Sequence, residues 1–336
     1  MFNGVNRHLY IYIIMSKESK KNKEGVRGNH GLSLLAQGSF GCIYHPGLTC
    51  DHEPLDAKYV TKIHSSEEKS AENEIAVSKK VQTIPNYELY FSPVLQSCEV
   101  NLAKVDREEV EKCSFVKDDI HKKKPITYTS TKIRFIDGKS LLDYIKQHSK
   151  YSTISFLYKT LCENVKKLAE KEIVHFDLRE NNMIVSKKGI PIIIDFGISI
   201  DFSNKPNKSS LKNTFYAFTT KYKPWCIEIV LICFIAHHKP SYVTSEKIME
   251  IFDEVMELND FANKPYLKED FPKYREKFKT QISTKPRQQL LDYLLSTYKR
   301  WDLYSVTILL IQMLETTNQE PDETHVKQIK EYLIKA

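Results

Sequence analysis

The residues with the clearest chemical potential in this 336-residue chain fall between positions 173 and 197. His175, Asp177 and Asn182 lie close together, and Asp195 follows thirteen residues after Asn182. Carboxylate and amide oxygens can hold a divalent metal ion, and a carboxylate in a loop can also orient a hydroxyl group. The residue types and their spacing therefore suit the transfer of a phosphoryl group to a hydroxyl.

A short β-hairpin is predicted to position these groups. The apolar runs Met183–Val185 and Ile190–Ile194 have the length of strands, and Lys187–Gly189 between them has the composition of a turn. Asn182 stands directly before the first run and Asp195 directly after the second. A rigid hairpin would hold the polar groups at its two ends.

Two stretches of the chain, His175–Ile184 and Ile193–Gly197, resemble the catalytic loop and the metal-binding motif of eukaryotic-type protein kinases. An isolated His-x-Asp triplet is common by chance, whereas its combination with the later Asn and Asp-Phe-Gly is far more specific. The resemblance implies ATP and Mg²⁺ as cofactors, with Asn182 and Asp195 as metal ligands.

The same resemblance gives each remaining polar residue of the loop a role. Asp177 would accept or orient the proton of the acceptor hydroxyl, and Arg179 would neutralise the γ-phosphate. His175 would brace the loop. Asp302, in the apolar run Arg300–Leu314, would lie on a buried central helix and brace the backbone of the same loop.

A glycine-containing hairpin is predicted ahead of these motifs. Leu34–Tyr44 has the pattern of a strand, a turn of small residues that includes Gly38 and Gly41, and a second strand. Glycine lets backbone N–H groups approach phosphate oxygens, because no Cβ stands in the way. The stretch resembles the kinase glycine-rich loop, although Ala36 replaces its first glycine.

The next strand, Tyr59–Ile63, carries a single lysine, Lys62, among apolar residues. It resembles the kinase strand whose Lys holds the α- and β-phosphates. A helix is predicted over Glu67–Gln82, and a Glu on its inner face should pair with Lys62. Glu74 fits better than Glu72, because the apolar residues after it then keep helical spacing.

The segment Ile133–Gly138 resembles the hinge of protein kinases, whose backbone meets the adenine base. The resemblance thus places ATP against seven residues: Gly38, Gly41, Ile43, Val60, Lys62, Arg134 and Ile136.

Strand-like runs cluster before this hinge and helical runs after it, which predicts an α+β, two-lobed kinase-like fold. We expect a flexible leader at 1–30, a β-rich N-lobe at 31–136 and a helical C-lobe at 137–336. The charged stretch Asn101–Pro125 is predicted as a looped insertion. A helical insertion at 241–299 is predicted to rearrange the C-lobe, and in this the chain also resembles divergent kinases of large DNA viruses.

Other positions bear on how activity is regulated and on which hydroxyl group accepts the phosphate. Phe176 replaces an Arg that pairs with a phosphorylated activation segment in many relatives, so we expect activity to be constitutive or set by a partner. Residues 201–220 have few apolar anchors, and we expect the inserted helices to hold them. Arg179 also occurs in some tyrosine kinases, whereas Thr219 and Tyr222 resemble the Ser/Thr type, so Ser and Thr of protein substrates are the favoured acceptors.

Two other functions stay open at the level of sequence. Small-molecule phosphotransferases share the HxDxxxxN pattern, but Gly197, the glycine hairpin and Lys62 favour the protein-kinase branch. A catalytically inactive scaffold is suggested by Ala36 and by the altered Pro224–Glu228 region, where a terminal Ala-Pro-Glu is absent or displaced. Retention of the charged and amide groups argues against it.

Composition sets limits on partners and compartment. With 41% apolar residues, 28% charged residues and a net charge of +7, the chain is typical of a globular protein and carries no concentrated basic stripe for nucleic acid. The apolar runs Tyr10–Ile14 and Ile227–Ala236 are too short to span a bilayer. Neither a membrane nor a specific nucleic acid is expected as a partner, and the oligomeric state stays open.

The seven cysteines form no CxxC pair, and a chain of this length needs no disulfide framework. A reducing, cytoplasmic compartment is therefore expected, in a host cell or virion if the chain is viral. A zinc site built from Cys42, His45, Cys50 and His52 is a minor alternative, because its spacing is irregular.

Overall fold

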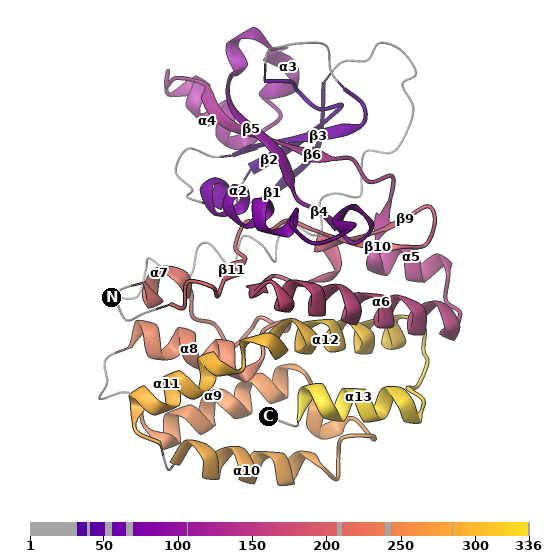
Figure 1. The fold of residues 1–336 in the computed structure, drawn as a ribbon, viewed down its shortest axis with the longest axis vertical. Helices are drawn as coiled ribbons and strands as arrows, with labels where there is room; N and C mark the ends of the chain where they lie inside the picture. Colours follow the sequence, from indigo (N-terminus) through magenta and orange to yellow (C-terminus); the bar gives the residue numbers. More distant parts are fainter. Residues whose placement is uncertain are drawn as a thin grey trace. The chain divides into compact units, whose positions relative to one another are not determined.

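The computed structural model describes residues 32–38, 41–50, 56–64, 70–105, 107–206, 210–238, 243–283 and 285–334. The predicted leader at 1–30 lies outside these residues. The described residues form two compact units. The first contains the chain up to Asp137 together with Ile194–Ile198, and the second contains Gly138–Ile193 and the chain from Ser199 onward. A sheet dominates the first unit and helices dominate the second, which confirms the predicted α+β class (Figure 1).

The first unit is built on an antiparallel five-stranded sheet. In its register Ile43 lies opposite Lys62, and Cys42 lies opposite Ile63. Because side chains alternate along a strand, Ile43 and Lys62 share one face, while Cys42 and Ile63 share the other. In spatial order the strands are β1 (Ser33–Gly38), β2 (Gly41–His45), β3 (Tyr59–His64), β6 (Thr127–Arg134) and β5 (Val94–Asn101).

Helix α2 (Ser70–Val81) packs against β5 and presents Glu74 toward Lys62. A 3₁₀ turn, η2 (Tyr87–Leu89), and the short strand β4 (Phe91–Ser92) connect it to β5.

The stretch 101–125, predicted as a loop, instead forms helical segments that cover the face of the sheet carrying Cys42. The prediction was wrong because it weighed the charges and missed an apolar spacing of three to four residues, Val110, Cys113, Val116 and Ile120. These side chains pack with Tyr44 and others of β2, β3 and β6. The segments are η3 (Leu102–Lys104), α3 (Arg107–Val110) and α4 (Ser114–His121).

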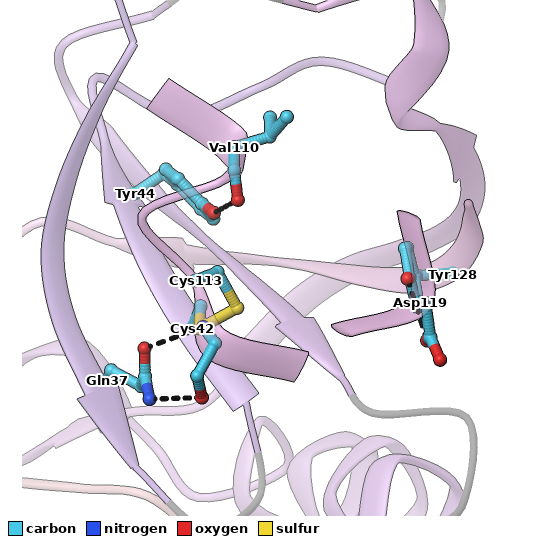
Figure 2. Close-up of a disulfide and its surroundings, with 8 residues drawn as sticks. Gln37, Cys42, Tyr44, Val110, Cys113, Asp119 and Tyr128 are labelled. Atoms are coloured by element: carbon cyan, nitrogen blue, oxygen red, sulfur yellow. Dashed lines mark hydrogen bonds between the residues drawn. A yellow bond between two sulfur atoms is a disulfide. The ribbon is translucent and has the colours of Figure 1, made fainter. Parts of the chain in front are cut away.

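Two disulfides cross-link this unit, Cys42–Cys113 and Cys50–Cys98. The first joins β2 to the residue before α4 (Figure 2). The expectation that the cysteines are reduced is wrong for these four of the seven. Disulfides persist mainly in oxidising environments, so the two links argue against the expected reducing compartment. Since Cys42 and Cys50 belong to different disulfides, the zinc alternative is also wrong.

The second unit begins with a small antiparallel sheet in the order β10-β9-β7. The predicted hairpin is present, with a turn at Gly189, whose φ of +79° favours glycine. A second pair, β8 (Ile173–Val174) with β11 (Ile200–Asp201), brackets the loop that holds Asp177. The strands of the small sheet are β7 (Gly138–Ser140), β9 (Met183–Ser186) and β10 (Pro191–Ile194).

Helices α6 (Tyr151–Glu170) and α12 (Trp301–Thr316) pack side by side in this unit (Figure 1). Thirteen of the sixteen residues of α12 are buried, so it is the central helix of the unit. No helix among the described residues is long and apolar enough to cross a membrane. The other helices are α5 (Leu141–Gln147), α7 (Leu211–Thr214), α8 (Ile227–His237), α9 (Ser245–Leu258), α10 (Phe271–Ser283), α11 (Arg287–Ser296) and α13 (Glu323–Leu333), with the 3₁₀ turns η4 (Glu180–Asn182), η6 (Phe261–Asn263) and η7 (Tyr298–Arg300).

Candidate active-site residues in the two units

A buried ion cluster lies on the α2 side of the sheet in the first unit. Lys62 Nζ is 2.8 Å from Glu74 Oε2 and 3.0 Å from Asp195 Oδ1. Lys62 and Glu74 are almost fully buried, while the Asp195 side chain keeps 29% of its exposure. The structure thus brings Glu74 to Lys62, as the helical spacing favoured. Glu72, two residues earlier, is exposed.

The charges of this cluster do not cancel. Burial alone would lower the pKa of Lys62, but the carboxylates of Asp195 and Glu74 raise it above its usual value. Burial raises the pKa of Glu74, against the attraction of Lys62. One ammonium between two carboxylates leaves an excess of negative charge on the more exposed side, at Asp195. A divalent cation there would offset that excess.

His64 supports the cluster from β3 and was not singled out by sequence. Its Nε2 lies 2.9 Å from Thr131 Oγ1 and 3.9 Å from Glu74 Oε2. Burial and the positive charge of Lys62 lower the pKa of His64 to about 3, so the imidazole is neutral. A neutral imidazole does not compete with Lys62 for Glu74.

The Asp195-Phe196-Gly197 motif is fixed to the rest of the first unit. Asn73 Nδ2 donates to the Gly197 carbonyl at 3.0 Å, and the buried Phe196 ring meets Phe91 edge to face at 6.2 Å. Asp195 itself has a φ of +66°, a conformation that non-glycine residues rarely adopt. Such positions persist where the surroundings over-determine them, and they cluster at functional sites.

The two glycines of the β1–β2 hairpin differ in what they do. A Cβ at Gly41 would lie 2.3 Å from the Ile63 carbonyl oxygen, so β2 can approach β3 only with glycine there. A Cβ at Gly38 would meet nothing within 4 Å. Gly41 is therefore explained by sheet packing, and only Gly38 retains the predicted freedom to approach a phosphate.

The remaining residues assigned to ATP lie in β2, β3 and the chain after β6. Val60 is buried, and Ile43 is half-buried on the face of Lys62. The Arg134 carbonyl accepts a hydrogen bond from Ser92 Oγ at 3.1 Å, and Ile136 is 9% exposed. These residues belong to one unit, as their assignment requires.

In the second unit, α12 holds the loop that contains Asp177. Asp302 accepts from the backbone N–H of His175 at 2.7 Å and from that of Phe176 at 3.3 Å. Burial raises the pKa of the Asp302 carboxyl to about 7, and the two N–H donors limit the rise. His175 Nδ1 in turn accepts from the N–H of Asp177 at 3.3 Å. The bracing geometry expected of Asp302 and His175 is present.

Phe176, which replaces an Arg of many relatives, has a φ of +70°. Trp225 Nε1 donates to its carbonyl at 2.9 Å, and the two rings lie 4.9 Å apart. The buried Phe215 ring meets Phe176 at 5.8 Å and Trp301 at 6.1 Å. Aromatic contacts therefore occupy the place of an Arg-to-phosphate pair.

Residues 201–220 have more apolar anchors than the sequence analysis expected. Phe202, Leu211 and Phe215 are buried, and Phe202 stacks on Tyr298 at 4.2 Å. Contacts also come from the predicted insertion at 241–299, where Tyr298 makes this stack and the Glu254 carboxylate accepts from Thr220 Oγ1 at 2.8 Å. The expectation of few apolar anchors was wrong because these anchors are spaced irregularly and contact residues far away in the sequence.

Asp177 and Asn182 lie together at the start of the β9–β10 hairpin. Asn182 Nδ2 donates to the Asp177 carbonyl at 2.8 Å and to Asp177 Oδ2 at 2.9 Å. The Tyr222 hydroxyl donates to the other carboxylate oxygen, Oδ1. Arg179 is half-buried, and its carbonyl accepts from the N–H of Asn182 at 2.9 Å. Sequence did not foresee the Tyr222 contact, because 45 residues separate the partners.

The donor sets suit Mg²⁺ better than a metal held by protein alone. Within the described ranges, no group of three or more His, Cys, Asp or Glu side chains could hold a metal ion. Mg²⁺ is commonly held by one or two carboxylates together with substrate phosphates and water. Asp195 of the first unit offers a carboxylate of this kind, and Asn182 of the second unit offers an amide oxygen.

Comparison with known proteins gives the family. Residues 120–300, just over half of the chain, match the Protein kinase domain family. A probable serine/threonine-protein kinase of Dictyostelium discoideum is 33% identical over 61 residues, which are 18% of this chain and 10% of that protein. Serine/threonine-protein kinases of Saccharomyces cerevisiae and Gibberella zeae are 24% identical over 110 residues and 30% identical over 90 residues. These matches span 30% and 27% of this chain.

The chain therefore matches only 10% to 17% of the length of these relatives. None of them supports the resemblance to kinases of large DNA viruses. The match over residues 120–300 includes His175, Asp177, Asn182 and Asp195, on which the resemblance was first based. By this match the chain belongs to the protein kinase domain family.

Proposed function

We propose that this chain is an ATP-dependent protein kinase that transfers the γ-phosphoryl group to Ser and Thr hydroxyls of protein substrates. The observation that carries the proposal is the position of Lys62 Nζ, which lies 2.8 Å from Glu74 Oε2 and 3.0 Å from Asp195 Oδ1, a residue 133 positions away in the sequence. An inactive scaffold would have no need to keep a buried lysine between two carboxylates, because burying charge costs free energy.

In this proposal the first unit is the nucleotide-binding N-lobe and the second is the C-lobe. Lys62, held by Glu74, binds the α- and β-phosphates, and Gly38, Gly41, Ile43, Val60, Arg134 and Ile136 surround the rest of ATP. Asp195 and Asn182 would hold Mg²⁺, which when bound would neutralise phosphate charge.

The second unit supplies the groups for the acceptor. Asp177 orients the acceptor hydroxyl and takes its proton, and Arg179 offsets the charge that develops on the transferred phosphoryl group. Ser and Thr are proposed as acceptors on the strength of Thr219 and Tyr222 in the activation segment and of the serine/threonine-protein kinases among the relatives. Protein substrates follow from membership of the kinase family.

The test measures ATP binding with and without Mg²⁺ and then phosphate transfer to a mixed protein substrate, with Asp177→Asn as the matched negative control. Transfer to Ser and Thr that disappears in the variant supports the proposal. Transfer only to small hydroxyl compounds would identify a small-molecule phosphotransferase. ATP binding without transfer would identify an inactive scaffold, and either result would overturn the proposal.

A further inference from the structure

The backbone oxygen of Arg134, which the proposed function places against ATP, already accepts a hydrogen bond. The hydroxyl of Ser92 donates to it at 3.1 Å, and Ser92 is 2% exposed. A buried carbonyl without a partner carries a cost in free energy, whereas one that has a partner does not. A bound nucleotide therefore does not need to bring a donor to this oxygen.

The chain on either side of this oxygen is held in place within the first unit. Arg134 Nη2 donates to the carbonyl of Glu88 at 2.6 Å and to that of Phe91 at 3.3 Å. The N–H of the next residue, Phe135, donates to the Lys58 carbonyl at 3.0 Å. Because its own side chain and the following N–H are both bonded, the Arg134 carbonyl is fixed in its present direction.

Ile136, two residues later, differs in that its backbone has hydrogen-bonding groups to spare. Neither its N–H nor its C=O makes a hydrogen bond to any residue that the structure describes, although Ile136 is only 9% exposed. Buried backbone groups are nearly always paired, so these two are completed by water or by a ligand. Ile136 therefore offers a base one donor and one acceptor.

The two purine bases differ at the edge that such a residue can read. Adenine carries an amino donor at C6 and an acceptor at N1, whereas guanine carries an oxygen acceptor at C6 and a donor at N1. The N–H of Ile136 can bind adenine N1 or guanine O6, and its C=O can also accept from guanine N1–H. A site rejects an analogue strongly when a buried polar group is left unpaired, and Ser92 prevents this at Arg134.

We propose that the nucleotide site reads a purine base through Ile136 and binds GTP as well as ATP. Ser92 is the positioning residue that sets this specificity, because it acts through the carbonyl of Arg134. The inference rests on the nucleotide site of the proposed function and names the class of nucleotide, purine triphosphates, that this site takes. All of the contacts that carry it lie within the first unit.

The test measures the dissociation constants of ATP and GTP, each with Mg²⁺, for the full-length chain by titration calorimetry. The two constants should agree within about tenfold, because the bases differ by one hydrogen bond to an oxygen that already has a partner. Ser92→Ala leaves that oxygen unpaired beside guanine and should shift the ratio toward ATP by at least about fivefold. Ser92→Thr keeps the hydroxyl and should keep the ratio. Ser130→Ala, at an equally buried serine opposite Ile63 on the other face of the sheet, should also leave it unchanged.

The outcomes separate this inference from the proposed function when phosphate transfer to a mixed protein substrate is measured alongside binding. Transfer from ATP, with GTP bound more than about tenfold more weakly, would overturn the inference and leave the kinase assignment standing. An unchanged ratio of the two constants in Ser92→Ala would also overturn it, since the hydroxyl would then have no part in specificity. Binding of both nucleotides without transfer from either would defeat the proposed kinase activity and leave the nucleotide specificity in place.

Discussion

The disulfide Cys42–Cys113 should be a major source of stability for the glycine hairpin. It joins β2 to the residue before α4 and closes a loop with a sequence separation of 71 residues. The neighbouring strand is tied to the same turn, because Gln37 Nε2 donates to Ser114 Oγ at 2.6 Å and Gln37 Oε1 accepts from the N–H of Ser114 at 3.0 Å (Figure 2). Both strands of the hairpin thus depend on the first turn of α4.

Replacing Cys113 with Ala breaks this link without adding a polar group to a fully buried position. For a loop of this length, the chain-entropy relation gives a loss of about 4 kcal/mol, which is an upper value because the unfolded chain retains some structure. A loss of about 4 kcal/mol corresponds to roughly a thousandfold change in the population of open states. The remaining Cys42 thiol behaves as a small apolar group, so the packing itself should survive.

Hydrogen exchange of backbone amides in β1 and β2 measures the population of these open states directly. Tryptophan fluorescence cannot do so, because both tryptophans, Trp225 and Trp301, lie in the second unit. Exchange should accelerate by up to about a thousandfold in Cys113→Ala. The matched control is Cys162→Ala, which removes a buried free thiol of the second unit and should leave these amides unchanged. Unchanged exchange in Cys113→Ala, or peptide maps without a Cys42–Cys113 link, would refute the reasoning.

Three further outcomes are expected. Under the proposed function Asp177 serves the acceptor and Asp195 the metal, so Asp177→Asn and Asp195→Asn should each lower phosphate transfer by roughly 10²-fold or more, a loss that exceeds any loss of stability in thermal unfolding; unchanged turnover in either would overturn the proposed kinase activity. Because its pKa is raised to about 7 in the folded chain, Asp302 contributes stability that is present below pH 4 and lost as pH rises to about 7. The free energy of unfolding, measured by chemical denaturation, should therefore fall over that pH range in the wild type and change less in Asp302→Asn. Phe215→Ala, at a fully buried ring, should cost about 3–5 kcal/mol by tryptophan-monitored unfolding, and a loss below about 1 kcal/mol would show that this ring does not anchor the segment.

Sequence alone predicted those features that depend on neighbours along the chain. The β9–β10 hairpin, the strand with Lys62 and the choice of Glu74 all follow from alternation and helical spacing within a few residues. The α+β class follows in the same way, because strand and helix periods are read locally. The kinase family could be proposed from His175 to Gly197 because its residues are close in sequence.

Only the tertiary structure decided which distant residues meet. The sulfur pairs are separated by 71 and 48 residues, and no local pattern selects one partner among seven cysteines. Gly41 is required by the Ile63 carbonyl of a neighbouring strand, and Tyr222 reaches Asp177 across 45 residues. Such contacts depend on strand register and on the packing of whole elements, and both result from the sum of many weak interactions. The sequence on either side of these residues therefore carries no periodic pattern that predicts the contact.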